Sequence, residues 1–452
     1  MREGGQGLRD RIALGVLTAT FPPAVVDEVV DAATKREQRY RLLPARLVVY
    51  YVLAMTLFRE AGYEEVMRQL TEGLVGFDND AATLEVPSSV AISKARQRLG
   101  KEPLEALFAR VCVPLATPTT RGAHYRNRRL VSMDGTVLDV ADTASNLAAF
   151  GRHHSGRGEA AFPQLRIVAL AECGTHAMFA ARIGASSDGE NTIAAPLAAS
   201  VGPGMLLLAD RGFGGSYELF CEFAERGCDL VWRVKKNAAL VVHERLSDGS
   251  FTSELPARAQ RSARVVRVVE YQVDDPGRPQ TEDNTYRLVT TILEPEAAPA
   301  TELAALYAER WEFETALDEL KTHQRGARIV LRSKTSDGVL QEAWGMLCVH
   351  YAIRALMCRA AEEGDVDPDR LSFTRSMRAA RRSVRRSVDD LATGLSHAKA
   401  EILHELLPNR RLRANPRVVR RKMSNFNLKR PEHGSWPQPT LPIEAAIRIV
   451  GA

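Results

Sequence analysis

Three carboxylates occupy positions from which they could act together on a metal ion. Asp134 follows the short apolar run "LVSM", and Asp210 follows the longer run "GMLLLA". A carboxylate directly after a buried strand is costly unless it is hydrogen-bonded or bound to a metal, and strand ends border the crevice where open α/β sheets bind ligands. Glu314 lies in a predicted helix. If that helix packs across the same sheet, the three carboxylates form one set.

Such a set is suited to Mg²⁺ or Mn²⁺, which prefer oxygen ligands. Two such ions about 3.5–4 Å apart activate an attacking hydroxyl and stabilise the leaving oxygen of a phosphodiester. Taken alone, each aspartate is also explained as a turn or cap residue. Asp139 and Asp142 compete with Asp134 for the first position. We prefer Asp134 because the run before it is more apolar and Gly135 permits a close approach of the backbone.

The segment "YAERWEFETALDELK", residues 307–321, surrounds the glutamate with two cations and a phenol. At about 100° per residue, Tyr307, Arg310, Glu314 and Lys321 fall within roughly 60° of one another on a helix. An adjoining apolar stripe would face a core; it consists of Leu306, Phe313, Leu317 and Leu320. This column could grip a DNA phosphate beside the carboxylate. The alternative is an amphipathic helix whose charges are paired or solvated.

A glycine-rich turn and a short strand supply further candidates for DNA contact. Arg211, Gly212 and Gly214 form a turn that enters a predicted helix, and such a turn could receive a phosphate. Arg233 and Lys235 stand at the end of the strand predicted in "CDLVWRVKK" and are assigned to DNA as well.

The composition is that of a folded protein of two or three domains. The 452 residues are 45% hydrophobic and 26% charged, which is typical of soluble globular chains. The longest uncharged apolar run, Leu47–Phe58, is far shorter than the ~20 residues of a membrane span, and Glu3 and Asp10 argue against a secretion signal. Six cysteines without C-x-x-C spacing predict reduced thiols. We expect a cytoplasmic protein without a membrane partner.

An arginine-rich segment makes the charge asymmetric. Residues 375–430 hold 16 Lys and Arg against 4 Asp and Glu, a balance of +12 in a chain of net charge +5, so the remainder carries −7. A helix over "FTRSMRAARRSVRRSV" would have two faces. The apolar face would consist of Phe373, Met377, Ala380 and Val384, and the cationic face of Arg375, Arg378, Arg382 and Arg385. The alternative is a solvated face. We expect contact with nucleic acid.

The order of predicted elements divides the chain into five parts. Residues 1–125 have helical periodicity throughout. In 126–237 the order strand-strand-strand-helix-strand-helix-strand predicts a ribonuclease-H-like α/β core with a mixed sheet. Residues 238–295 are a β-rich insertion, 296–365 return to the core with the helix of the glutamate, and 366–452 form a basic helical region.

The first part contains one pattern with two explanations. In "PSSVAISKARQRLG", Ser88 and Ser89 are helix caps, followed by Lys94, Arg96 and Arg98, and the next helix begins near residue 102. Two short helices around a tight connection, one of them basic, fit a helix-turn-helix-like DNA reader. A plain helical bundle explains the pattern equally well.

Together, these motifs resemble those of a known family. The pattern Y-x2-R-x3-E-x6-K, from Tyr307 to Lys321, matches the YREK signature of bacterial insertion-sequence transposases with a DDE active site, the "insertion sequence four" group. "MDGT" and "LLLADRGF" resemble the two catalytic-aspartate motifs of that family. "NPRVVRRKMSNFNLKRP" resembles the tail of many members, and residues 8–110 resemble their N-terminal domain. The resemblance covers nearly the whole chain.

The resemblance implies a catalytic domain that cuts DNA at transposon ends and joins the freed 3′ hydroxyls to a target. Asp134, Asp210 and Glu314 would be the ligands of two Mg²⁺ or Mn²⁺ ions. Residues 1–125 would bind the terminal inverted repeats, with the signature residues Tyr307, Arg310 and Lys321 contacting DNA near the cut. A homodimer in the synaptic complex and association with the nucleoid are expected as well. Some members use a hairpin intermediate, which nothing in this sequence requires.

Other functions remain open at this point. A stand-alone metal-dependent nuclease on the same fold would not need the basic region or the helical N-terminal part. A domesticated DNA-binding protein without catalysis would not need an intact set of three acids. A two-carboxylate glycosidase would leave the basic block unexplained, and aromatic residues make up only 6% of the chain.

Overall fold

A computed structural model gives the fold of the chain. The described residues are 14–39, 41–75, 86–155, 158–256, 262–274, 285–326, 329–385, 391–408, 418–419, 427–428, 430–431 and 441–451. They divide into two compact units, the first formed by 1–124, 134–197 and 312–408, the second by 125–133, 198–311 and 409–452. Each unit is described by itself below. The chain passes between them within strand β2 (Arg128–Asp139) and again between Trp311 and Glu312.

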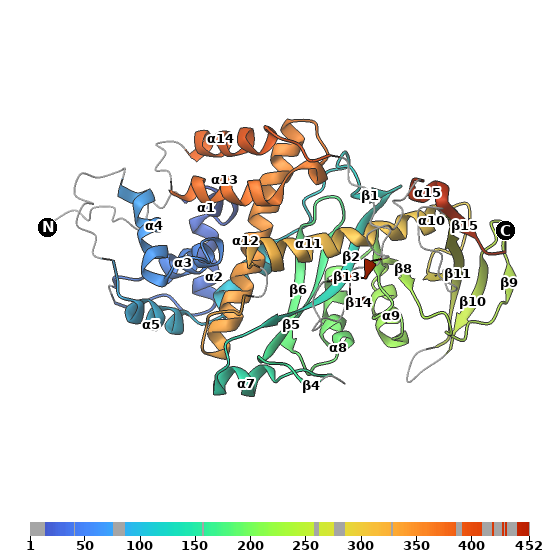
Figure 1. The fold of residues 1–452 in the computed structure, drawn as a ribbon, viewed down its shortest axis with the longest axis horizontal. Helices are drawn as coiled ribbons and strands as arrows, with labels where there is room; N and C mark the ends of the chain where they lie inside the picture. The colour runs from blue at the N-terminus through green and yellow to red at the C-terminus, as the bar shows by residue number, and fades with distance from the viewer. Residues whose placement is uncertain are drawn as a thin grey trace. The chain divides into compact units, whose positions relative to one another are not determined.

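The first unit is mainly helical. Its helices are α1 Val16–Thr20, α2 Pro23–Ala32, α3 Ala45–Leu57, α4 Tyr63–Val75, α5 Ser89–Leu99, α6 Glu102–Val111, α7 Ala144–Phe150, α8 Glu190–Ala194, α11 Trp311–Asp318, α12 Ser336–Glu363, α13 Phe373–Arg385 and α14 Leu391–Leu403. The 28-residue α12 begins at a cap in which Thr335 accepts the Gly338 N–H. It is buried along most of its length, because α1, α3, α6, α13 and α14 pack around it (Figure 1). The predicted helical N-terminal part is thus built around a helix that comes more than 200 residues later in the chain.

Within this bundle α5 serves the core. Ser88 caps it by accepting the Ala91 N–H at 3.3 Å, and Gly100 ends it with a φ of 70°. Arg96 is 6% exposed, and its guanidinium donates to Gln341 and to the Tyr63 hydroxyl, at 2.7 and 2.8 Å. Because this arginine ties α5 to α4 and α12, the structure favours the plain helical bundle over a helix-turn-helix reader that presents Arg96 to DNA.

The strands follow the predicted order. In the first unit, β5 (Gln164–Glu172) and β6 (Met178–Ala185) form an antiparallel hairpin beside β2. In the second unit, β2 pairs in parallel with β7 (Met205–Ala209), which pairs in parallel with β8 (Asp229–Arg233). Numbered along the chain, these core strands have the order 3-2-1-4-5. A mixed sheet with α8 and α9 (Tyr217–Ala224) between its later strands confirms the predicted ribonuclease-H-like fold class.

The predicted insertion extends this sheet. Its strands are β9 Glu244–Arg245, β10 Phe251–Leu255, β11 Arg264–Val273 and β12 Tyr286–Thr290. β12 pairs antiparallel with β8, and β11 and β10 follow in order. The end of the chain adds β15 (Ile447–Ile449) to β11, so the predicted helical C-terminal part also contains a strand. The second unit also holds α10 Ala300–Leu306, the 3₁₀ turn η3 Tyr307–Arg310 and α15 Ile443–Ala446.

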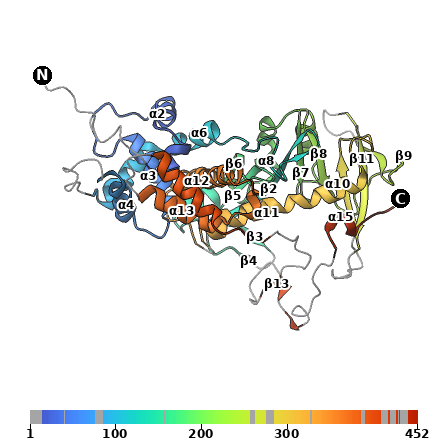
Figure 2. The same cartoon turned by 90° about the horizontal axis from the view of Figure 1, so that it is seen from above.

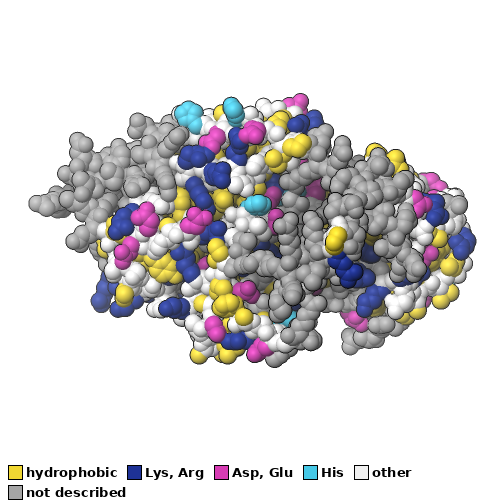
Figure 3. Space-filling model, viewed as in Figure 1, with side chains coloured by type: hydrophobic (Ala, Val, Ile, Leu, Met, Phe, Trp, Pro, Cys, Tyr) yellow, Lys and Arg dark blue, Asp and Glu magenta, His cyan; other side chains and the backbone are white. Residues whose placement is uncertain are grey.

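Helix α13 buries the apolar face that the sequence predicts. Its four apolar stripe residues are at most 5% exposed. The helix packs against α1, α4 and α12, and Figure 2 shows it beside α12. Part of its cationic face is used inside the unit, because Arg375 and Arg382 form ion pairs with Glu405 and Glu401. On the face drawn in Figure 3, Lys and Arg side chains alternate with Asp and Glu. No helix among the described residues is long and apolar enough to cross a membrane.

Candidate active site

Two of the predicted carboxylates follow paired positions of adjacent parallel strands. In the second unit the register of β2 and β7 runs from Arg129↔Met205 to Met133↔Ala209. The residues that come directly after this last pair are Asp134 and Asp210. Strand pairing therefore brings the chain to both aspartates at the same level of the sheet. Both side chains are partly exposed, as a ligand site requires.

The surroundings of the competing aspartates differ from those of Asp134. Asp139 accepts a hydrogen bond from the Gln164 amide at 2.7 Å. Asp142 forms an ion pair with Arg152 at 2.8 Å. Asp134, by contrast, receives the N–H of the next residue at 2.7 Å, a bond that fixes the carboxylate at the backbone. These contacts favour the preference for Asp134, whose role stays a prediction.

A fourth carboxylate, which the sequence did not single out, lies against the same backbone. A methyl group built on Gly135 would come within 1.9 Å of Oε1 of Glu190. Only a glycine leaves room for the Glu190 carboxylate here, next to Asp134 in the chain. Glu190 is the first residue of α8 and is half-buried. An acidic residue that opens the helix after a hairpin, in "SDGEN", was the signal that could have drawn attention to it.

The glycine-rich turn after β7 closes on Asp210. Oδ1 of Asp210 accepts the Gly212 N–H at 2.7 Å, and its main-chain carbonyl accepts the Gly214 N–H at 3.1 Å. A methyl group on Gly214 would meet the Arg233 carbonyl at 2.0 Å, so this glycine permits close packing against β8. The prediction that this turn cradles a phosphate with its N–H groups is therefore weakened. Arg211 remains an exposed side chain at the turn.

In the second unit a phenol and two arginines gather near Asp210. The turn η3 contacts β7, and Tyr307 and Arg310 are 5% and 7% exposed. Burial raises the pKa of Tyr307 to about 12, although the positive charges of Arg310 and Arg233 lower it. The negative charge of Asp210 adds to the rise. The phenol therefore keeps its proton at neutral pH and can donate a hydrogen bond to an anion.

Aromatic rings line the two arginines. The Arg310 guanidinium lies 5.9 Å from the Tyr307 ring centroid and 5.4 Å from that of Trp311. Arg233 lies 4.3 Å from the centroid of Tyr286. Rings beside a guanidinium restrict its orientation through cation–π contact. Two guanidinium groups that are oriented in this way are suited to contact a phosphate.

The helical wheel drawn for 307–321 is wrong in detail. The segment is a 3₁₀ turn over Tyr307–Arg310, an α-helix over Trp311–Asp318 and a π-helix over Glu319–Gln324. A constant 100° per residue therefore does not relate Tyr307 to Lys321. Such π segments are rare and often occur at functional sites.

The remaining predicted residues have separate surroundings. Glu314 and Lys321 are half-buried in the first unit, and Lys235 is exposed in the second. The predicted triad is divided between the units, since Asp134 and Glu314 belong to the first and Asp210 to the second. Convergence of the three carboxylates therefore stays a prediction.

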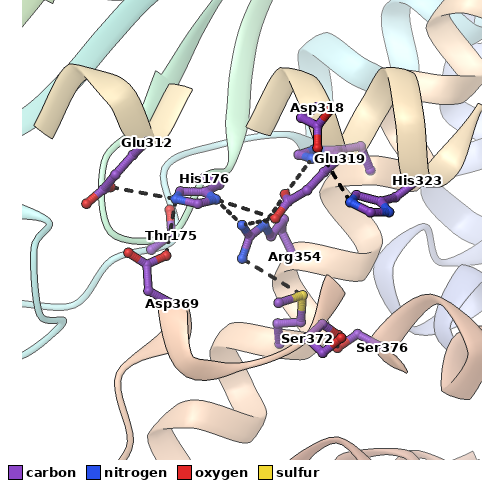
Figure 4. A network of polar contacts seen from close by, with 12 residues as sticks. Thr175, His176, Glu312, Asp318, Glu319, His323, Arg354, Asp369, Ser372 and Ser376 are labelled. Carbon is purple, nitrogen blue, oxygen red and sulfur yellow. Dashed lines mark hydrogen bonds and ion pairs between the residues drawn. The ribbon is translucent and has the colours of Figure 1, made fainter. Parts of the chain in front are cut away.

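A buried cluster of acids and histidines was missed by sequence reasoning (Figure 4). His176, in the turn between β5 and β6, is 1% exposed and has a φ of 55°, a strained value for a residue other than glycine. Its Nε2 lies 3.2 Å from Oδ1 of Asp369 and 3.8 Å from Oε2 of Glu312. Among the described residues these three could hold a metal ion by distance alone. Their positions, far apart in the sequence, gave no ligand-like spacing.

Comparison with known proteins identifies the family of the chain. The family model "Transposase DDE domain" matches residues 125–352, and "Insertion element 4 transposase N-terminal" matches residues 11–109. The chain belongs to the DDE transposase family. It is thus an enzyme that acts on DNA, and the predicted resemblance is confirmed. The DDE domain implies dependence on a divalent metal.

The chain is also similar to individual proteins. The chain is 28% identical over 426 residues to the transposase InsG for insertion sequence element IS4 of Escherichia coli K12, covering 89% of this chain and 88% of that one. It is 24% identical over 252 residues to the putative transposase InsZ of the same organism, covering 55% and 81%. A piggyBac transposase synaptic complex with hairpin DNA aligns with a TM-score of 0.47 and 12% identity, over 90% of this chain and 88% of that one.

Proposed function

We propose that this transposase binds the terminal inverted repeats of an insertion sequence, cuts at its ends with divalent metal ions and joins the freed 3′ ends to a target. The observation that carries the proposal is the strand register that leads from Met133↔Ala209 to Asp134 and Asp210. Membership of the DDE family supplies the class of reaction. The InsG relative, named as the transposase of an insertion sequence element, supports this choice of substrate.

The donor set fits a hard divalent cation. Asp134, Asp210 and Glu314 would hold two Mg²⁺ or Mn²⁺ ions, since all three offer carboxylate oxygens, the ligands these ions prefer. When bound, such ions lower the pKa of the attacking hydroxyl and stabilise the leaving oxygen. The N–H groups of Gly135 and Gly212 orient the two aspartates by donating to one oxygen of each.

The residues near Asp210 would position the scissile phosphate. Arg310 and Arg233 supply charge, and Tyr307 supplies a neutral donor. In cleavage, a water oxygen loses a proton and bonds to phosphorus as the bond from phosphorus to the 3′ oxygen breaks, and the leaving 3′ oxygen takes up a proton to become a 3′ hydroxyl. In strand transfer, that 3′ hydroxyl bonds to a target phosphorus and displaces the target's own 3′ oxygen. Lys321, Arg211 and Lys235 are further candidates for phosphate contact.

Joining two ends to one target requires two active sites, so we also propose a homodimer in the synaptic complex. A stand-alone nuclease remains the second candidate, because the three carboxylates alone would support hydrolysis. It is disfavoured by the match of residues 11–109 to a transposase N-terminal region, which a nuclease does not need.

The test uses a labelled DNA fragment that spans one end of the element with its flanking sequence. Glu314→Gln should bind this fragment as the parent does in a gel-shift assay, yet show no Mg²⁺-dependent cleavage. Asp142→Asn, a change at an exposed and ion-paired aspartate, is the matched control and should cleave at the parental rate. Cleavage by Glu314→Gln at the parental rate would contradict the proposed site. Cleavage without any strand transfer would favour the nuclease.

A further inference from the structure

A network of buried ionic groups surrounds one side of the segment that carries Glu314. Glu319, 3% exposed at the start of the π-helix, accepts two hydrogen bonds from Arg354, from Nε at 2.9 Å and from Nη2 at 2.7 Å. Nε2 of His350 lies 3.3 Å from Oε2 of this carboxylate, the oxygen that Arg354 Nε also contacts. Arg354 is itself 1% exposed, in the middle of α12. A planar guanidinium that grips a carboxylate with two bonds fixes both its distance and its orientation.

The same network continues through the β5–β6 turn. Nη2 of Arg354 contacts Nδ1 of His176, and on its other side the ring faces Asp369 and Glu312 (Figure 4). Glu312 in turn accepts the N–H of Gly174. The α11–π segment is thus held at two of its residues, by α12 through Glu319 and by the hairpin turn through Glu312.

The tautomer of His176 argues against a metal ion in this cluster. A guanidinium can only donate hydrogen bonds, so the Nδ1 that faces Arg354 is an acceptor and the ring proton sits on Nε2. A metal would need the lone pair of Nε2, which is then occupied by hydrogen. Nε2 carries the ring proton instead and lies within ion-pair distance of Asp369 and Glu312, so it links the turn to these carboxylates electrostatically.

The anchored residues lie opposite Glu314 on the helix. Glu312 and Glu319 are seven residues apart, about two helical turns, so they project from nearly the same face. Glu314 is two residues after Glu312 and projects about 200° away from it. Any rotation of the segment that released the anchors would move the Glu314 carboxylate by a similar angle. Fixing one face therefore fixes the direction of the other.

We propose that Arg354, Glu319 and His176 are positioning residues that lock the rotation of α11 and hold Glu314 in its metal-binding direction. The proposal rests on the proposed function of Glu314. It assigns to α12 a role in catalysis that operates through packing, without contact between Arg354 and DNA or metal.

The test is Arg354→Lys, which keeps the charge but cannot form the two hydrogen bonds that the guanidinium makes to Glu319. Hydrogen–deuterium exchange of residues 312–324 should become faster, whereas exchange in α3 stays parental. Cleavage at saturating Mg²⁺ should fall by between about 10-fold and 10²-fold, the cost of a misplaced catalytic group. The Mg²⁺ concentration for half-maximal cleavage should rise, while DNA affinity without divalent ions is unchanged.

Arg267→Lys is the matched control. Arg267 is also a fully buried arginine, and it contacts Asp248 and Ser250 in the second unit. This variant should lose thermal stability but keep the parental Mg²⁺ dependence. Parental exchange of 312–324 in Arg354→Lys would overturn the proposal, whatever the fate of the proposed function. Faster exchange with parental Mg²⁺ dependence would overturn it too. A stoichiometric metal in the purified protein that is lost in His176→Ala would replace it with a structural metal site.

Discussion

The segment from Tyr307 to Gln324 is held by different chemistry in its two parts. Tyr307 and Arg310, counted with the second unit, lie among aromatic rings and a second arginine near Asp210. Glu312 and Glu319, counted with the first, are held in a network in which Arg354 binds Glu319 and His176 faces Glu312. The first part places its arginines beside aromatic rings, whereas the second ties its glutamates to a buried arginine and a buried histidine.

Burial of a polar residue does not by itself indicate its role. Arg310 and Arg354 are both nearly buried, at 7% and 1% exposure. Arg310 lies beside the rings of Tyr307 and Trp311, whereas Arg354 binds the buried carboxylate of Glu319. We therefore expect substitutions in the first part to change cleavage at nearly constant stability, and substitutions in the second to change stability first.

The largest effect is expected for Arg354→Ala. It leaves the Glu319 carboxylate buried without its guanidinium, and breaking such a pair costs about 3–5 kcal/mol of unfolding free energy. Arg310→Ala, in the other part, should cost clearly less. Urea denaturation followed by circular dichroism measures both values. Equal losses in the two variants would remove the distinction drawn between the two parts.

The next effect concerns Arg310→Lys, which keeps the charge and the fold. Lysine offers a point charge where the guanidinium forks onto two phosphate oxygens, and a misplacement of the phosphate by 1 Å can cost about 10²-fold in rate. Cleavage of a labelled end should therefore fall with little change in melting temperature. A parental rate, with a stability loss of a few tenths of a kcal/mol, would mean that this arginine has only a structural role.

Acidification should weaken the second part alone. Burial lowers the pKa of His350 below its usual 6.5, so its contribution to stability is complete above pH 6.5 and is lost as the pH falls toward the folded value. Burial would raise the pKa of Glu319, but Arg354 and the two histidines hold it well below 4.5, so a second loss follows at lower pH. Melting temperatures between pH 8 and about 2 measure both losses. His350→Gln should flatten the upper step; an unchanged profile would contradict it.

The smallest effect on stability is expected for Gly135→Ala. The added methyl group would meet the flexible end of Glu190 at 1.9 Å, and that side chain can turn away. The loss of unfolding free energy should be about 1 kcal/mol. If the Glu190 carboxylate supports Asp134, cleavage falls although stability is nearly kept. A parental rate would show that Glu190 is a neighbour without influence on the reaction.

The sequence could predict the parts of the molecule that follow from local pattern. Apolar runs predicted β2 and β7, and the stripe of Phe373 and Val384 predicted the buried face of α13. Asp210 directly follows β7 as predicted, but Asp134 does not end its strand, because β2 continues to Asp139. The order of strands and helices along the core also followed, because each element has its own hydrophobic period.

Features that depend on distant partners could not be predicted in this way. Nothing near Glu319 in the sequence announces Arg354 or His176, which approach it only when α12 and the hairpin pack together. The change from 3₁₀ to α to π within 307–324 likewise escapes a wheel of constant pitch, because packing decides it. Arg96 was read as a possible DNA contact for the same reason: its partners Gln341 and Ser333 lie far along the chain.

Convergence of Asp134, Asp210 and Glu314 on shared metal ions is the central claim. It is tested most directly by replacing Mg²⁺ with Fe²⁺ and generating hydroxyl radicals, which cut the backbone next to the bound ion. We expect cuts near all three residues. Excess Mg²⁺ should suppress these cuts, and they should be absent in Asp210→Asn. Cuts confined to one of the three positions, or cuts near His176 and Asp369 instead, would contradict it.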